Sequence, residues 1–270
     1  MLPMTADTLR LGAFTGIFVV LAFAENRFPR RPLSASKSQR WFVNLSIVAL
    51  DNLLTRLLLP LAPVALAERA GAEGWGLFNL LGLNSWLELM VSLLLLDLLI
   101  YLQHRIFHRI PLLWLLHRVH HTDLDLDVSS GTRFHPLEIL LSLCIKMGAV
   151  LALGVSPQAV ILFEVLLNAT AMFSHTDLRL PLKLDSWLRL MMVTPDMHRV
   201  HHSVHPVETD SNFGFNLPWW DRLLGTYRAQ PRDGHDRMLI GLQEFRDQTS
   251  LGLRHLLVMP FAAYRVRSNE

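Results

Sequence analysis

Residues 86–102 read WLELMVSLLLLDLLIYL, and this apolar run decides the class of the fold. A helix needs about 20 mostly apolar residues to cross a bilayer. The stretch from Trp75 to about Tyr101 reaches that length, so we expect it to form a membrane-spanning helix. The composition agrees, because 51% of the 270 residues are hydrophobic and the mean hydropathy is positive, which is unusual for soluble domains. The sequence therefore predicts an all-α integral membrane protein.

Three further apolar regions accompany this helix. Residues 9–24 are slightly short, but no basic charge precedes them and no clear cleavage site follows, so we expect a membrane helix and no signal peptide. Residues 42–67 are long enough but contain Asp51 and Arg56, so one side of that segment should face protein or water. Residues 137–173 are interrupted by LGVSPQ, whose Gly and Pro suit a tight turn. The expected fold is a bundle of about four spans, of which the last is a helical hairpin.

Basic residues in the short loops predict the orientation of this bundle. The loop at residues 25–41 holds five of them, whereas residues 68–74 hold only Arg69. This asymmetry predicts that the first loop is cytoplasmic. Following the spans from there puts every histidine and the C-terminus in a cytoplasmic, histidine-rich cap. In a bacterial cell the protein would lie in the inner membrane.

Histidines form the main pattern of the second half. The thirteen histidines begin only at His104, and eight of them form three clusters with helical spacing. HRIFH puts two imidazoles on one helical face, and HRVHH, which occurs twice, puts three at i, i+3 and i+4. The clustered residues are His104, His108, His117, His120, His121, His198, His201 and His202. Neutral imidazoles bind borderline metals, and eight are twice what one closed tetrahedral site needs. We expect the three imidazoles of each HRVHH to converge, and we expect two metal ions.

Three residues near these clusters are further candidates. His175 follows the returning arm of the hairpin and should emerge beside the clusters, so we expect a ninth ligand. His135 begins the hairpin and could be a ligand, a group that supports a ligand or a substrate-facing residue, and we leave it out of the ligand set. Asp97 lies near the end of an apolar span, where an acid is costly unless it has a partner. We expect Asp97 to accept a hydrogen bond from the second ring N–H of a ligand histidine.

One cysteine and two arginines are expected to have structural roles. Cys144 lies in the apolar run LLSLCIKMG and is expected to be a small buried hydrophobic residue. Arg118 and Arg199, the arginines of the two HRVHH words, could pair with acids such as Asp123 or Asp196 or face lipid headgroups.

The donor set restricts the metal and the reaction. Nitrogen ligands without thiolates suit iron, copper or zinc, and open positions beside a membrane suit O2 chemistry. Zinc peptidase chemistry is disfavoured, because no HExxH occurs. A membrane metal transporter and a haem-binding electron-transfer protein are the alternatives; the first would need a continuous polar path, and the second would need single histidines on two helices. A net charge of +2 and the absence of a recognisable motif argue against nucleic acid as a partner.

The order of the histidine motifs along the chain, HRIFH, HRVHH, His175 and the second HRVHH, resembles that of the fatty acid hydroxylase superfamily, in its bacterial sterol-desaturase-type branch. The resemblance extends to RFHPLE at 133–138, to NFGFNLPWWDRLLGTY at 212–227, and to the closing IGLQEF and MPF. It covers residues 97–261, the expected catalytic region. Residues 1–96 would then form an N-terminal transmembrane region, and 262–270 a short tail.

The resemblance implies a membrane-bound, non-haem di-iron enzyme that uses O2 to hydroxylate or desaturate a C–H bond of a lipid. The lipid could be fatty acyl, sterol-like or isoprenoid, and ether cleavage also occurs in the superfamily. The nine histidines named above would be the iron ligands. Trp219 and Trp220 would line the substrate entrance or anchor the cap at the membrane interface. No cytochrome b5-like domain is appended, so a separate protein, such as a ferredoxin or a cytochrome b5-like carrier, is expected to supply electrons.

Overall fold

The computed structural model describes residues 6–59, 63–247 and 251–262, and within these ranges it contains helices, loops and two isolated β-bridges but no extended strand. The predicted all-α fold is confirmed. The elements are α1 (Ala6–Arg27), α2 (Lys37–Leu58), α3 (Pro63–Ala72), α4 (Leu77–Leu81), α5 (Ser85–Arg109), α6 (Pro111–His121), η1 (Ser130–Thr132), α7 (Pro136–Leu153), α8 (Pro157–His175), α9 (Leu182–Leu188), α10 (Pro195–His201), α11 (Pro206–Thr209), α12 (Trp219–Leu223), α13 (Leu253–Val258) and η3 (Met259–Phe261).

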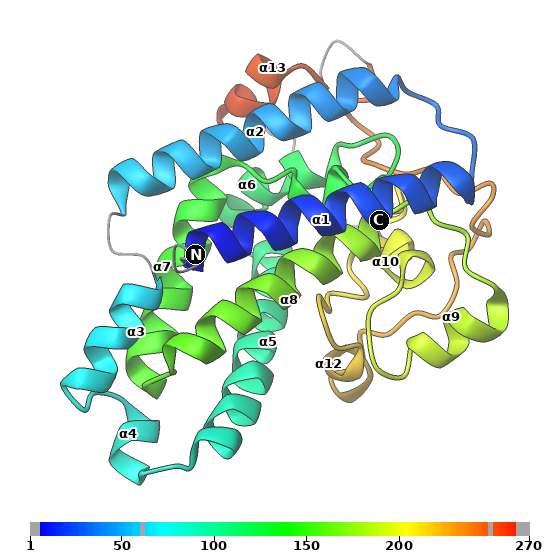
Figure 1. Cartoon of the computed structure of the whole chain (residues 1–270). Coiled ribbons are helices and arrows are strands. Elements are labelled where there is room, and N and C mark those ends of the chain that lie inside the picture. Colours follow the sequence, from blue (N-terminus) through cyan, green and yellow to red (C-terminus); the bar gives the residue numbers. More distant parts are fainter. Residues whose placement is uncertain (1–5, 60–62, 248–250, 263–270) are drawn as a thin grey trace.

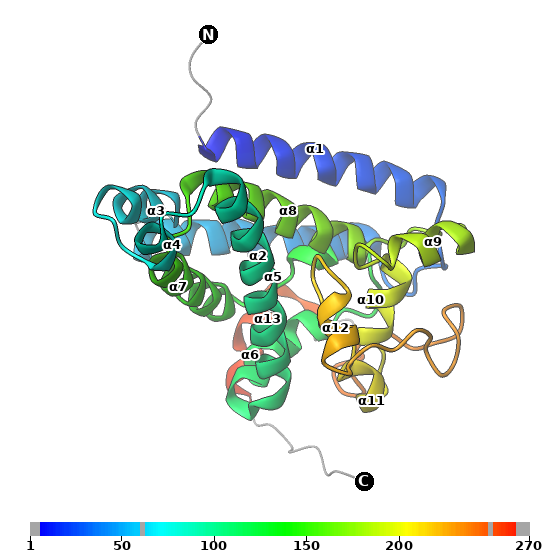
Figure 2. The ribbon, with the colours of Figure 1, turned by 90° about the horizontal axis from the view of Figure 1, so that it is seen from below.

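The long helices form a bundle with the short C-terminal helices at one end. Helix α1 lies along α8 on the outside of the bundle (Figures 1 and 2). Helices α9 to α12 gather at the end opposite α3 and α4 (Figure 1). The apolar core lies where α5, α7 and α8 meet, and it includes Ile100, Val150 and Phe163. This arrangement separates an apolar bundle from a cap of short helices and loops.

Five helical segments are long and apolar enough to cross a membrane: α1, the segment that begins with α2, α5, α7 and α8. The predicted hairpin is present as α7 and α8. Its turn uses Gly154, whose φ of 71° lies in the left-handed region and whose position leaves 2.6 Å between an added Cβ and the carbonyl oxygen of Trp75. Because each arm of the hairpin counts as one segment, five segments agree with the expected bundle.

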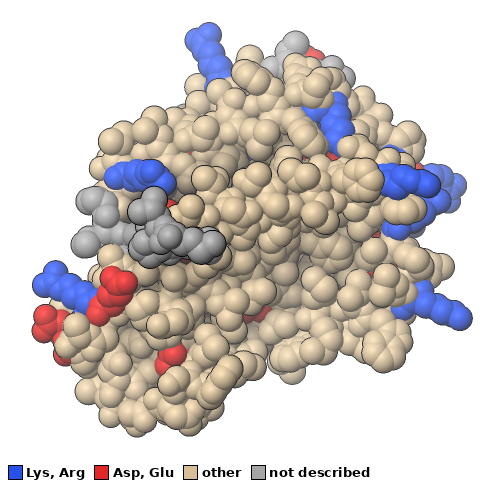
Figure 3. All heavy atoms as spheres, in the orientation of Figure 1, with Lys and Arg blue, Asp and Glu red and all other residues tan. Residues whose placement is uncertain are grey.

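The surface of the bundle fits contact with lipid. On α1, Val20 and Phe23 are 65% and 74% exposed, and Figure 3 shows a broad face without charge, with most lysines and arginines at its rim. Large exposed apolar surfaces are unusual in soluble monomers and mark sites of membrane or protein contact. Cys144 also lies on the surface of α7, so the expectation that it is buried is wrong.

The boundaries of two predicted spans differ from the structure. The apolar run from Trp75 does not form one helix: Gly82 ends α4 in the left-handed region, and Asn84 caps α5 by accepting a hydrogen bond from the Leu87 backbone N–H at 3.0 Å. In the second region α2 ends at Leu58 and α3 begins at Pro63, and residues 60–62 lie outside the described residues. At its C-terminal end α5 continues past the predicted end at Tyr101 to Arg109, and this added part carries His104 and His108.

Helix α2 turns a polar side toward the protein, as predicted from its charges. Asp51 is buried, and Arg40, which is 3% exposed, fixes the loop after α6. The Arg40 guanidinium donates to Asp123 at 2.6 Å, to Asp127 at 2.7 Å and to Ser130 Oγ at 2.8 Å. A buried charge that loses its partner is strongly destabilising, so these contacts tie the loop to α2.

Candidate metal centre

Eight histidines from α5, α6, α8 and α10, together with His202, which directly follows α10, come together between the bundle and the cap. Their imidazoles form two groups, and within each group one nitrogen from every ring lies within 4.8 Å of the others. The five-histidine group contains His104, His108, His117, His121 and His201, and the four-histidine group contains His120, His175, His198 and His202. All nine side chains are buried. The structure thus brings together all nine residues that the spacing and the resemblance singled out.

The two HRVHH words do not each converge on one point, and that expectation is wrong. In the first word His117 and His121 join the five-histidine group, whereas His120 joins the four-histidine group. The second word divides in the same way, with His201 separated from His198 and His202. With 3.6 residues per turn, residues i and i+4 are about 40° apart, but i+3 lies about 100° from i+4. Each word therefore serves both groups.

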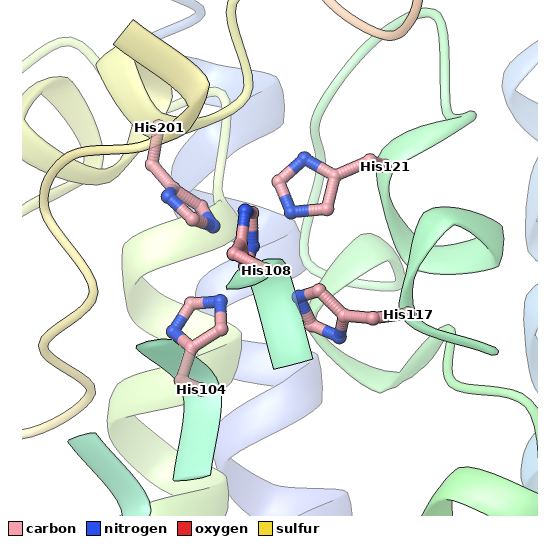
Figure 4. A group of neighbouring side chains, drawn as sticks. All are labelled: His104, His108, His117, His121 and His201. Carbon is pink, nitrogen blue, oxygen red and sulfur yellow. The ribbon is translucent and has the colours of Figure 1, made fainter. Parts of the chain in front are cut away.

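The rings of the five-histidine group point toward a common centre (Figure 4). His104 Nδ1–H donates to the Phe213 carbonyl at 2.8 Å, and His201 Nδ1–H donates to the Ser211 carbonyl at 2.7 Å. A carbonyl only accepts, so Nδ1 carries the proton in these rings and Nε2 presents a lone pair. In the described part of the chain the Nε2 atoms of all five rings have no hydrogen-bond partner. Five buried nitrogens that face one another without a partner fit a metal ion.

The four-histidine group is more tightly gathered. His175 Nε2 lies 3.1 Å from Nε2 of both His120 and His198 and 3.2 Å from that of His202. The Nδ1–H of His175 donates to the Ala171 carbonyl at 2.7 Å, so its Nε2 is also a lone pair. Two nitrogens bound tetrahedrally to one metal at about 2.0 Å would lie about 3.3 Å apart. The spacing of this group fits a single metal ion.

The electrostatics of the site also favour metal binding. Burial lowers the pKa of His117 to about 3 and lowers the pKa values of His120, His121 and His201 well below the usual value. These rings are therefore neutral near pH 7, which is the form that binds metals. Neither group contains a carboxylate or a thiolate, so the donors fit iron and related borderline metals.

One segment that the sequence did not reveal orients three of the five histidines. In residues 210–213 the Asp210 carboxylate lies 3.3 Å from His108 Nδ1, and the carbonyls of Ser211 and Phe213 accept from His201 and His104. Backbone carbonyls have no signature in a sequence, so spacing alone could not identify them. Glu138 was also missed: its Oε1 lies 2.6 Å from His117 Nδ1, and its place in RFHPLE had suggested no role.

Two buried polar side chains hold this segment. Asn212, at φ 52°, donates to the carbonyls of Met197 and Arg228 at 2.9 and 2.8 Å. The Asp221 carboxylate accepts from the backbone N–H groups of Phe213 and Gly214 at 2.8 and 2.9 Å. The position of the carbonyls that orient the histidines therefore depends on contacts between residues 7 to 16 positions apart in the chain.

Asp97 does not accept a hydrogen bond from a histidine, and that expectation is wrong. Its carboxylate accepts from the side chains of Asn216 and Trp220, each at 2.8 Å. Seven residues along a helix correspond to about 10 Å, so an acid two turns from His104 cannot reach that ring. Asp97 instead holds the segment that leads into α12.

His135 lies outside both groups. It is the N-cap of α7, where its Nδ1 accepts from the Leu137 backbone N–H at 3.2 Å and its Nε2–H donates to the Leu257 carbonyl at 3.2 Å. Since both ring nitrogens are engaged, His135 offers no free lone pair to a metal. Leaving it out of the ligand set agrees with this geometry.

The two arginines of the HRVHH words are both buried, so neither faces lipid headgroups. Arg199 pairs with Asp196, as one alternative predicted, and it also lies 3.7 Å from Asp177. Arg118 instead donates to the Met259 carbonyl and lies over the ring of Phe245. These contacts attach the two histidine helices to different parts of the cap.

The two tryptophans after residue 218 face different surroundings. Trp220 is half-buried against Asp97, whereas Trp219 is 36% exposed and donates to the Leu190 carbonyl at 2.7 Å.

Comparisons with known proteins agree with the histidine pattern. Residues 89–226, which include all nine histidines, match the family model described as fatty acid hydroxylase. The chain is 31% identical over 146 residues to the ornithine lipid hydroxylase of Rhizobium tropici, a match that covers 54% of this chain and 43% of that protein. It is 30% identical over 171 residues to human alkylglycerol monooxygenase, covering 63% of this chain and 36% of that protein. Human cholesterol 25-hydroxylase is 27% identical over 146 residues, covering 53% and 52% of the two chains.

The chain thus spans less than half of the length of the first two relatives. No solved structure matches it.

Proposed function

The chain belongs to the fatty acid hydroxylase family, and on that premise we propose that it is a membrane-bound di-iron enzyme that uses O2 to oxidise a C–H bond of a lipid. The observation that carries the proposal is the convergence of nine buried imidazoles into two groups beside apolar helices. Bound iron would supply the activation of O2, which no side chain can perform alone. The relatives named above are hydroxylases or monooxygenases of lipids, which favours hydroxylation over desaturation.

The chain's own residues would hold and orient two iron ions. We assign one ion to the five-histidine group and the other to the four-histidine group. The Nδ1–H groups of His104 and His201 are fixed by carbonyls, so each ring keeps its Nε2 lone pair directed inward. Their burial would exclude bulk water from the reaction.

The surroundings suggest the substrate and the partners. Exposed apolar side chains on the long helices favour a substrate that reaches the site from the bilayer, such as a fatty acyl, sterol-like or isoprenoid lipid. A separate protein such as a ferredoxin or a cytochrome b5-like carrier would deliver electrons. Five basic residues in 25–41, which join the end of α1 to the start of α2, support a cytoplasmic location of the histidine groups and the C-terminus. We keep residues 97–261 as the catalytic region, 1–96 as the N-terminal transmembrane region and 262–270 as the tail.

The alternatives, a metal transporter and a haem protein, fit the geometry less well. A transporter needs sites that release their ion along a polar path, whereas these nitrogens converge in two closed, buried groups. A haem protein needs one histidine on each side of a large planar ring, and rings packed with centroids 4.3 to 5.0 Å apart around His175 leave no such space.

Metal analysis of the detergent-purified chain tests the proposal. We expect about two irons per chain, and less iron in His120→Ala and His201→Ala. His135→Ala is the matched control, because that ring lies outside both groups, and it should keep the wild-type content. Zinc alone, or unchanged iron in the first two variants, would refute the assignment.

Lipid analysis tests the reaction. Membranes of cells with and without the gene, under an active electron supply, should differ by a lipid that has gained one oxygen or lost two hydrogens. The mass change then separates hydroxylation from desaturation. If the lipids are the same with a loaded, reducible metal centre, no lipid of that membrane is the substrate.

A further inference from the structure

A polar cavity of about 290 Å³ lies directly behind the five-histidine group, on the side of the C-terminal end of α5. Asp210 and Ser211 form part of its wall, and these are the residues that contact His108 and His201. Its wall also includes three arginines that converge from two distant parts of the chain: Arg105, Arg109 and Arg228. These three arginines lie outside the two histidine groups.

Of these three arginines, Arg105 forms a hydrogen bond with the Tyr101 hydroxyl. Among the residues described, none of the three forms an ion pair, and Asp210, the one acid in the wall, lies against His108. The Nε of Arg228 is buried without a hydrogen-bond partner, although the Arg228 backbone is held on both sides by Asn212. Unsatisfied buried donors are uncommon in native proteins and call for an explanation. A bound anion would satisfy them.

The neighbouring surface indicates what carries the anion. Along α5, Leu102 and Ile106 are 39% and 46% exposed, and they lie about one turn before Arg105 and Arg109, respectively. This places apolar surface next to a cationic cavity at the end of a candidate membrane span. A lipid has the same pairing, with an anionic group at the level where its chains begin. The cavity is also concave and small, which suits one headgroup better than the face of a protein.

We propose that this cavity binds the phosphate or carboxylate group of an anionic lipid, with the lipid chains against Leu102 and Ile106 of α5. Arginine forms paired hydrogen bonds with phosphate and carboxylate groups, which gives the cavity both strength and selectivity. Because Asp210 and Ser211 belong to its wall, the bound headgroup contacts the segment that orients His108 and His201. The proposal does not depend on the metal or on the reaction.

Native mass spectrometry of the full-length, detergent-purified protein tests this site. Phosphatidylglycerol is the probe, and diacylglycerol with the same chains is the comparison without a charge. We expect one tightly held phosphatidylglycerol per chain, and at least a roughly tenfold weaker retention in the double variant Arg109→Gln/Arg228→Gln, since two charge-assisted contacts are lost. Arg254→Gln, which removes an exposed arginine of α13, is the matched control and should bind as the wild type does.

Three results would overturn the proposal. Equal retention by the double variant and the wild type would remove the arginines from the site, and equal retention of diacylglycerol would remove the anion. Complete displacement by inorganic phosphate at the same concentration would identify a site for free anions instead of lipids. If phosphatidylglycerol binding is unchanged while the double variant is reduced more slowly by an acidic donor protein, the surface serves that protein. An unchanged metal content and melting temperature would confirm that the variant is folded.

Discussion

The two histidine groups are built on different supports. In the five-histidine group, His104, His108 and His201 are oriented by one loop segment, residues 210–213, which is itself held by remote side chains. In the four-histidine group, His175 is oriented by the carbonyl of Ala171 in its own helix. The Nδ1 of His120, in the same group, lies 3.2 Å from the carbonyl oxygen of Arg133. The first group thus depends on one loop segment for three rings, whereas the second uses its own helix for His175 and a different loop for His120. This difference predicts that the two metal sites can be weakened separately.

The largest expected effect is a loss of metal affinity when a histidine is removed from the group that has fewer ligands. His201 and His202 are adjacent in sequence but belong to different groups. His202→Ala leaves three nitrogens in its group, whereas His201→Ala leaves four, so the first change should weaken total metal binding more. We expect metal affinity to fall more than about 100-fold for His202→Ala, beyond the effect of losing a supporting contact. Competition with a chelator measures this, and equal losses in both variants would contradict the division of the groups.

Loss of the buried arginine on α2 should have the next largest effect. Arg40→Gln leaves Asp123 and Asp127 without their main cationic partner, which is expected to cost about 3–5 kcal/mol of stability. Thermal unfolding in detergent would show this as a lower melting temperature. Arg56→Gln, on the same helix, is the control: its side chain is 75% exposed and lies 3.8 Å from Asp7, so it should change stability by less than about 1 kcal/mol.

A change in the loop support should weaken the five-histidine group more than the four-histidine group. In Asp221→Asn the amide cannot accept the two backbone N–H bonds and the Thr226 hydroxyl bond as a carboxylate does. The Phe213 carbonyl should then hold His104 less firmly, and affinity for the metal of the five-histidine group should fall about 10- to 100-fold. A two-site metal titration resolves the groups. Asp233→Asn, at a carboxylate that pairs with the half-buried His205, serves as control, and an equal loss at both sites would refute the separation.

The smallest expected effect concerns the carboxylate beside His117. Glu138→Gln preserves an acceptor for His117 Nδ1–H but replaces a carboxyl oxygen with an amide oxygen, which supports the imidazole less strongly as a donor to a metal. We expect a loss of affinity of less than about tenfold, and a larger loss for Glu138→Ala, which removes the acceptor as well. If the two variants bind metal equally well, the carboxylate does not orient this ring.

The sequence identified which histidines come together, but it did not predict how they divide between the two groups. Helical spacing reveals which residues share a face, so His104 and His108 could be paired from the sequence alone. Helical spacing did not predict that His120 would belong to a different group from His117 and His121. His120 and His121 differ by about 100° around the helix axis, and this difference separates them only when a metal site lies on each side. The orienting carbonyls could not be foreseen at all, since any residue type provides one.

The sequence likewise predicted which helices form better than it predicted where they begin and end. The apolar lengths predicted the bundle and the hairpin, but the start of α5 was set by the local conformation at Gly82 and the cap at Asn84. Hydropathy cannot detect such a break inside a continuous apolar run. The polar partners of Asp97 were hidden for another reason, because Asn216 and Trp220 lie more than a hundred residues away in the chain.

The division of each HRVHH word between the two groups has a thermodynamic consequence. Helices α6 and α10 each contribute to both groups, so ordering them around a first ion also assembles much of the second cage. The second ion then meets a site whose entropy of ordering has already been lost, and its affinity should be higher. Loading should be positively cooperative, with a Hill coefficient above 1 and fewer molecules that hold a single ion than two independent sites of the same affinities would give. Native mass spectrometry during a metal titration would count these species, and abundant half-loaded protein would show that the two cages assemble independently.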